Sequence, residues 1–149
     1  MVKIYFDTCS LHRPLDNKSQ LRITLEAEAV LGVLAMCEDG RLTLVSSEVL
    51  SLEVDRNPQT QKRAYVSSIL ERAQIVIAVD DRIEKRAKDL EQRGFKAFDA
   101  LHLAAAEAGS VDYFCTCDDR VLRKSRQQAD LSVKVLSPLD LAHEVFHDD

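Results

Sequence analysis

The sequence contains no apolar run long enough to span a bilayer, and Asp7 stands where a secretory signal would continue with apolar residues. We therefore expect a cytoplasmic protein with no membrane partner. The sequence also contains no internal repeat, linker or low-complexity segment. With 149 residues, of which 46% are hydrophobic and 30% charged, it is long enough to bury a substantial core. We predict a single domain over residues 1–149.

The four cysteines form neither a disulfide framework nor a zinc signature. They are irregularly spaced in a chain without a secretory signal, which predicts reduced thiols. Cys115 and Cys117 form one C-x-C pair, but no second pair of Cys or His lies at a matching spacing. We therefore expect no structural zinc and no thiol catalysis.

The chain also has no excess of positive charge. The net charge of −5 argues against a protein that holds nucleic acid by bulk electrostatics, since phosphate binding generally depends on clustered Lys and Arg. It does not exclude a metal-dependent nuclease, because bound cations reverse the local charge where the phosphate approaches. The most basic stretch is a predicted helix over 120–128, which is either a solvated face or a phosphate-contacting patch formed by Arg120, Arg123, Lys124 and Arg126.

Short apolar runs alternate with amphipathic segments along the whole chain. The apolar runs are typical of strands in a parallel sheet and cover 2–6, 42–46, 75–79, 113–116 and 133–136. The amphipathic segments predict helices over 19–38, 47–57, 59–72, 81–93, 99–109, 120–128 and 139–146. This alternation predicts an α/β protein, a three-layer α/β/α domain with a central, mainly parallel sheet.

Two further local predictions concern the first third of the chain. Pro, Asp and Asn residues within 11–17 predict a loop, in which His12 and Arg13 are either solvated or within reach of a phosphate. In the helix over 19–38 the apolar positions recur at helical spacing. Its acids Glu26 and Glu28 are expected to face solvent.

Three aspartates are candidates for a functional site. Asp7 follows the first strand and Asp118 follows the fourth, and in α/β sheets ligands bind just beyond the carboxyl ends of the strands. Asp99 opens an alanine-rich helix that can pack closely against the sheet. The alternatives are a turn-forming role for Asp7 and a helix N-cap role for Asp99.

Two glutamates in the helix over 47–57 compete for a fourth position. Ser47 is the expected N-cap, and Glu48 falls in the first turn, where a carboxylate stabilises the helix dipole without any functional role. Glu53 lies deeper in the helix among apolar neighbours, so it is harder to explain as a cap. We therefore select Glu53, on the basis of its spacing from Ser47.

Four carboxylates at one edge of the sheet would raise one another's pKa unless a cation compensates them. Ligands that are all oxygen suit Mg²⁺ or Mn²⁺, and such ions activate water for phosphodiester hydrolysis. We predict direct or water-mediated metal contact for Asp7, Asp99 and Asp118. Glu53 would complete the site or orient the attacking water.

These motifs together resemble the PIN-domain family, and within it the single-domain VapC-type toxins of bacterial toxin–antitoxin pairs. The resemblance rests on Asp7-Thr8, on Ser47 followed by Glu53, on Phe98-Asp99-Ala100-Leu101-His102-Leu103-Ala104, and on Thr116-Cys117-Asp118. It covers nearly the whole chain. It implies a metal-dependent ribonuclease that acts on RNA, is commonly a homodimer and is inhibited by a small antitoxin protein.

The resemblance also implies that the four carboxylates form the catalytic quartet, with support from Asp119 or Thr116. Two alternatives stay open. A phosphatase of the haloacid dehalogenase type would use Asp7 as a nucleophile, but it would carry a second Asp where this chain has Cys9. A PIN-like binding module without catalysis would retain several clustered acids with no metal, which is unfavourable.

Overall fold

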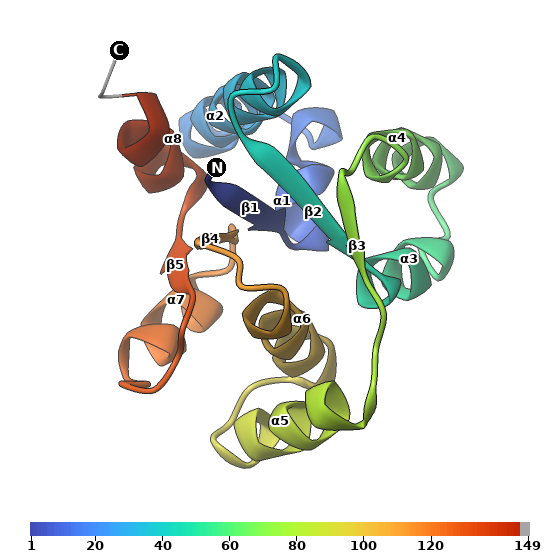
Figure 1. Cartoon of the computed structure of the whole chain (residues 1–149). Coiled ribbons are helices and arrows are strands. Elements are labelled where there is room, and N and C mark those ends of the chain that lie inside the picture. The colour runs from blue at the N-terminus through green and yellow to red at the C-terminus, as the bar shows by residue number, and fades with distance from the viewer. Residues whose placement is uncertain (147–149) are drawn as a thin grey trace.

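The computed structural model describes residues 1–146, so residues 147–149 of the predicted domain lie outside the described residues. Its centre is a sheet in the order β3-β2-β1-β4-β5, in which every neighbouring pair is parallel (Figure 1). The strands are β1 (Lys3–Phe6), β2 (Thr43–Ser47), β3 (Ile75–Ile77), β4 (Tyr113–Cys115) and β5 (Lys134–Leu136). The predicted parallel sheet is thus confirmed.

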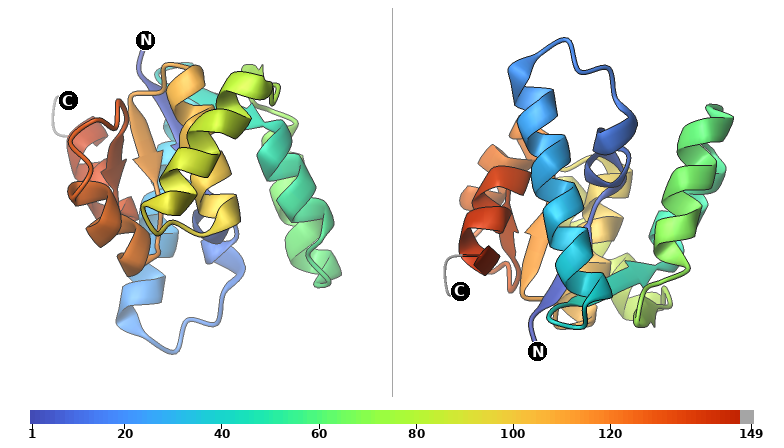
Figure 2. Two further views of the ribbon diagram at one scale, coloured as in Figure 1. Left: turned by 90° about the horizontal axis from the view of Figure 1, so that it is seen from below. Right: turned by 90° about the horizontal axis from the view of Figure 1, so that it is seen from above.

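Helices cover both faces of this sheet. They are α1 (Thr8–Leu11), the 3₁₀ turn η1 (Arg13–Leu15), α2 (Leu21–Glu38), α3 (Glu48–Asp55), α4 (Thr60–Leu70), α5 (Asp81–Gln92), α6 (Ala97–Ala108), α7 (Asp119–Arg126) and α8 (Pro138–Phe146). Helices α2 and α8 lie on one face, and α5 and α6 lie on the other (Figure 1). Helices α3 and α4 lie side by side at the β3 end of the sheet (Figure 2). The predicted three-layer α/β/α fold is confirmed.

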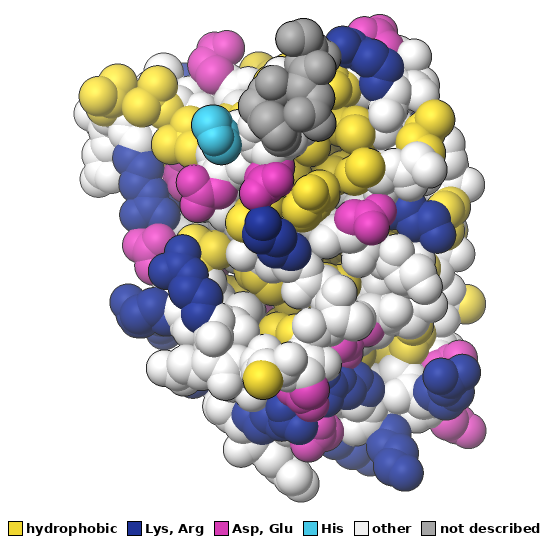
Figure 3. Space-filling view, turned by 60° about the vertical axis from the view of Figure 1, so that its left-hand side comes forward, with side chains coloured by type: hydrophobic (Ala, Val, Ile, Leu, Met, Phe, Trp, Pro, Cys, Tyr) yellow, Lys and Arg dark blue, Asp and Glu magenta, His cyan; other side chains and the backbone are white. Residues whose placement is uncertain are grey.

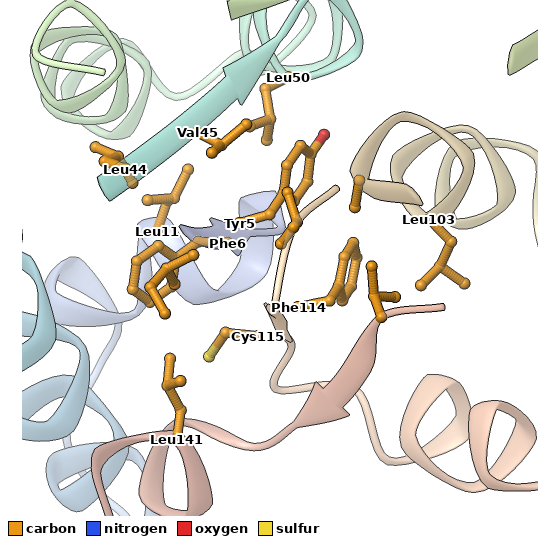
Figure 4. Packing of buried hydrophobic residues seen from close by; sticks show 14 of the residues in the cluster. Tyr5, Phe6, Leu11, Leu44, Val45, Leu50, Leu103, Phe114, Cys115 and Leu141 are labelled. Atoms are coloured by element: carbon orange, nitrogen blue, oxygen red, sulfur yellow. The ribbon is translucent and has the colours of Figure 1, made fainter. Parts of the chain in front are cut away.

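The central strand β1 is buried on both faces, as expected for the middle of a parallel sheet. Successive side chains of a strand point to opposite faces, so Tyr5 packs toward α6 and Phe6 packs toward Leu11 (Figure 4). The rings of Tyr5 and Phe114 stack with their centroids 5.3 Å apart. This packing fixes the carboxyl end of β1, from which the candidate site begins.

Two boundary predictions were wrong. Residues 8–11 form α1 and residues 13–15 form η1, where a loop over 11–17 was predicted. Pro14 is tolerated because it lies at the start of η1, where its missing N–H is not needed. Helix α6 begins at Ala97 with Lys96 as its N-cap, so Asp99 is its third residue and not its cap.

Glu26 was expected to face solvent, and this prediction was also wrong. Its side chain is only 2% exposed, and its carboxylate lies 2.9 Å from Arg13 and 3.4 Å from Arg22. Both arginines compensate a charge that would otherwise be costly to bury. Arg13 is therefore occupied by an ion pair within the fold, while Glu28 on the same helix is exposed as predicted.

Within residues 1–146 no helix is both long and apolar enough to cross a membrane.

Candidate active site

Asp7 lies directly beyond the carboxyl end of β1. Its backbone N–H donates to the Cys115 carbonyl at 3.1 Å, and its carboxylate caps α1 by accepting from the Ser10 N–H at 3.1 Å. The side chain is buried, with 5% of its surface exposed. Burial raises the pKa of Asp7, while hydrogen bonds from Thr116, Cys9 and Ser10 partly oppose this rise. Asp7 is thus both a helix cap and a buried carboxylate.

Asp118 lies just beyond the next strand, β4, and caps α7. Its carboxylate accepts from the Arg120 N–H at 2.8 Å, and its own N–H donates to the Thr116 hydroxyl at 3.1 Å. Thr116 is fully buried and also hydrogen-bonds the side chain of Asp7. Thr116 therefore links the two aspartates.

Glu53 approaches the same region from α3, where it is the sixth residue. Its Oε1 accepts from the Thr8 hydroxyl and from His102 Nε2, the latter at 2.8 Å. Burial raises the pKa of Glu53, but the hydrogen bonds from His102 and Thr8 outweigh it and hold the pKa below its usual value. Glu53 is therefore held as a carboxylate, with 30% of its side chain exposed.

A buried chain of hydrogen bonds positions His102. Its Nδ1 lies 2.6 Å from the Tyr5 hydroxyl, which lies 2.7 Å from the Ser47 hydroxyl. Ser47 in turn accepts from the Leu50 N–H as the N-cap of α3, as predicted. A carboxylate only accepts hydrogen bonds, so Nε2 carries the proton that faces Glu53. Both ring nitrogens of His102 are thus occupied, and the side chain is 1% exposed.

Asp99 completes the group from the first turn of α6. Its carboxylate forms no hydrogen bond with the described part of the chain. The pKa of Asp99 is raised from 3.8 to about 6, by burial first and then by the negative charges of Asp7, Asp118 and Glu53, while His102 partly opposes the rise. Asp99 therefore lies close enough to the other three predicted carboxylates for their charges to act on it.

Two other acids near these segments are bound to partners outside the four carboxylates. Glu48 accepts from the Val79 N–H at 2.6 Å, beyond the end of β3. Asp119 forms an exposed ion pair with Arg22 at 2.8 Å. These contacts account for Glu48 and Asp119 without any role at the carboxylate group.

Neither Tyr5 nor His102 was predicted from the sequence to have a role. His102 is three residues after Asp99, a spacing that places both side chains on one helix face. Tyr5 is on β1, two residues before Asp7. These spacings are the signals that would have indicated both residues.

The fold and these side chains define a class of protein, an α/β domain with a carboxylate cluster beyond the carboxyl ends of its central parallel strands. The chain belongs to the PIN-domain family, because the family model for the PIN domain matches residues 4–127. PIN domains are generally nucleases. The matched range contains all four carboxylates. No curated protein sequence matches the chain significantly.

Several solved structures share the fold. A chain of VapBC2 from Rickettsia felis, bound to a DNA fragment from its promoter, matches with a TM-score of 0.59 and 16% identity, over 91% of this chain and 98% of that one. A chain of FitAB bound to a DNA fragment matches with a TM-score of 0.57 and 20% identity, over 91% and 94%. PAE2754 from Pyrobaculum aerophilum matches with a TM-score of 0.56 and 14% identity, over 96% of each chain.

Proposed function

We propose that this chain is a divalent-metal-dependent endoribonuclease that hydrolyses RNA phosphodiester bonds. Its catalytic residues would be Asp7, Glu53, Asp99 and Asp118. The observation that carries the proposal is the convergence of these carboxylates: Thr116 links Asp7 to Asp118, Thr8 beside Asp7 binds Glu53, and all three disfavour the charge of the buried Asp99. A bound cation removes this conflict. Membership of a family of nucleases supports the same conclusion.

The residues present fit Mg²⁺ or Mn²⁺. The donors are carboxylate oxygens, and Asp99 has no hydrogen-bond donor of its own among the described residues. Within residues 1–146 no three His, Cys, Asp or Glu side chains are arranged to hold an ion by themselves. Water molecules would therefore complete the coordination, as is usual for Mg²⁺. When bound, the metal supplies an activated water and neutralises charge on the phosphate.

The chain's own residues would prepare this chemistry. Ser10 and Thr116 hold the carboxylate of Asp7 in place, and the Arg120 N–H holds that of Asp118. His102 and Thr8 fix Glu53 as a carboxylate, which suits it to orient the attacking water. Asp99, with no such restraint, is available to the metal. Hydrogen bonds thus hold three of the four acids in place, and all four would contact the metal directly or through water.

We further propose that the protein is the toxin of a toxin–antitoxin pair. It would act on RNA in the cytoplasm as a homodimer and be inhibited by a small antitoxin protein. The resemblance of its motifs to VapC-type toxins and the shared fold with VapBC2 and FitAB support this proposal. 

The test is cleavage of single-stranded and structured RNAs by the purified protein, free of any antitoxin, with Mn²⁺, with Mg²⁺ and with EDTA. Asp99→Asn is assayed beside it. We expect cleavage that requires metal and disappears in the variant. Equal cleavage by both proteins would indicate a contaminating nuclease. If neither protein cleaves any RNA, the chain is better explained as a PIN-like binding module.

A further inference from the structure

We propose that a small cavity beside the carboxylates binds a backbone phosphate of the RNA strand, through Lys96, Arg120 and Lys124. The cavity has a volume of about 120 Å³, and Asp99 and Asp118 form its border with the candidate active site. This inference rests on the proposed ribonuclease function and names the residues that would hold the strand next to the reacting phosphate.

The location of the cavity suits a strand that passes through the active site. It lies where the amino end of α6 meets the first turns of α7, and its border acids are Asp99 in α6 and Asp118, the N-cap of α7. A water molecule takes up about 30 Å³ in the liquid, so the cavity holds roughly four waters. That volume is enough for one phosphate group, and the basic lining of Lys96, Arg120 and Lys124 favours such an anion. The site would therefore contact the backbone and not read the sequence.

The charges of the three side chains are available to a ligand. Within the described residues Lys96 and Lys124 form no ion pair, and Arg120 lies 3.8 Å from Asp118, with 64% of its side chain exposed. Most other arginines are already paired with acids, as are Arg13, Arg22, Arg41, Arg72, Arg86 and Arg93. Figure 3 shows basic and acidic side chains interspersed over one face of the molecule. The cavity is thus lined by two lysines without an acidic partner among the described residues and by Arg120, whose contact with Asp118 is long and exposed.

The backbone around the cavity supports this arrangement. Gly94 ends the α5 turn with a φ of +102°, and a Cβ there would come within 2.7 Å of the Lys124 ammonium. The glycine that the turn requires thus also leaves room for this ammonium. At the start of α6, no side chain caps the free N–H groups. Their partial positive charge adds to that of the three side chains.

Only part of the basic stretch in the sequence belongs to this site. Arg120 and Lys124 line the cavity, whereas Arg123 and Arg126 on the same helix do not. Arg126 is exposed. Arg120 and Lys124 would therefore contact a phosphate, whereas Arg123 and Arg126 belong to the solvated face of α7. Arg126 also provides a control for the loss of one positive charge.

The test measures binding of a labelled single-stranded RNA to protein that carries Asp99→Asn, so that cleavage does not interfere. In that background Lys96→Gln, Arg120→Gln and Lys124→Gln are compared with Arg126→Gln. Each of the first three should weaken binding about five- to tenfold and reduce the slope of log K against log salt by about 0.7, as expected for one lost single-strand phosphate contact. Arg126→Gln should change neither.

A second measurement locates the contact on the RNA. Methylphosphonate linkages, which are uncharged, replace the phosphates one position at a time. One position should weaken binding to protein with Lys124 but have no effect in the Lys124→Gln protein. If all four charge variants weaken binding equally, or none does, the phosphate site is overturned while RNA binding stands. If the Asp99→Asn protein binds no RNA at all, the proposed function fails together with it.

Discussion

His102 and Glu53 lie 49 residues apart in the chain, and a hydrogen bond of 2.8 Å joins Nε2 of the imidazole to Oε1 of the carboxylate. The histidine is anchored on its other side by Tyr5, a residue of the central strand. The orientation of Glu53 is therefore set by the sheet itself and not only by α3, the short helix that carries it. Rigid support of this kind is what a residue that aligns a reacting water requires.

Glu53→Gln should abolish most cleavage, whereas Glu48→Gln should not. Loss of a residue that positions or deprotonates water lowers the rate by about 100-fold or more. Glu48 instead accepts a hydrogen bond from the Val79 N–H, away from the other carboxylates. Initial rates of RNA cleavage with Mn²⁺ would measure both variants. Equal losses in the two, with both proteins folded, would contradict the choice of Glu53.

Tyr5→Phe should destabilise the protein, because it removes a buried hydroxyl that bonds both His102 and Ser47. We expect a loss of about 1–3 kcal/mol in the free energy of unfolding. Urea unfolding followed by circular dichroism would measure it. Tyr65→Phe is a matched control, because the Tyr65 hydroxyl has no hydrogen bond within the described chain, and its effect should stay within about 0.5 kcal/mol. Equal effects in the two variants would count against the buried chain of hydrogen bonds.

Asp99→Asn should raise the melting temperature when no divalent metal is present and the pH is above 6. Because the pKa of Asp99 is raised from 3.8 to about 6 in the folded protein, its charge disfavours folding above that range. The folded state then holds the proton more tightly than the unfolded state, so stability falls as the pH rises from 3.8 to 6. Asparagine lacks this charge. Thermal melts of both proteins should therefore differ at neutral pH and converge below pH 3.8, and a constant difference would contradict the assignment.

Mn²⁺ or Mg²⁺ should stabilise the wild-type protein by binding only its folded state. At a concentration about 100 times the Kd, the expected gain is about 2.7 kcal/mol. Asp99→Asn should remove most of this gain, since Asp99 is the carboxylate that has no other partner among the described residues. Melting curves over a metal titration would measure the effect. NaCl at the same ionic strength, without any divalent metal, is the control. A gain of the same size with NaCl would show that screening of the carboxylate charges alone is responsible.

Glu26→Gln should be strongly destabilising, because it leaves Arg13 beside a neutral partner in a buried position. Breaking a buried ion pair on one side costs about 3–5 kcal/mol, and the remaining contact of Arg13 with Asp16 should keep the loss near the lower value. Glu28→Gln on the exposed face of the same helix should change stability by less than about 0.5 kcal/mol. Urea unfolding of both variants would distinguish a buried ion pair from a surface one.

Local patterns were sufficient to predict the layers of this fold and the proximity of Asp7 to Asp118. Strands of a parallel sheet are apolar runs, and their carboxyl ends share one edge, so Asp7 and Asp118 could be placed near each other from sequence alone. The burial of Glu26 could not be predicted in this way. Its partner Arg13 lies in a separate segment, and the period of α2 does not reveal which residue will cover it.

The same limit explains what was missed at the site. The contact between His102 and Tyr5 joins residues 97 positions apart, so no window of sequence contains both. The helix start was misplaced because Asp99 is a good N-cap residue, whereas the structure uses Lys96, whose side chain caps nothing. Propensity identified the helix, and packing decided where it begins.

A chain still emerging from the ribosome cannot assemble this site early. Strand β1 is made first, but it occupies the middle of the sheet and one of its two neighbours, β4, begins only at residue 113. Asp118 follows later still, so a chain interrupted before that point lacks one of the four acids. For the proposed ribonuclease, this order of synthesis withholds activity until Asp118 has been added to the chain.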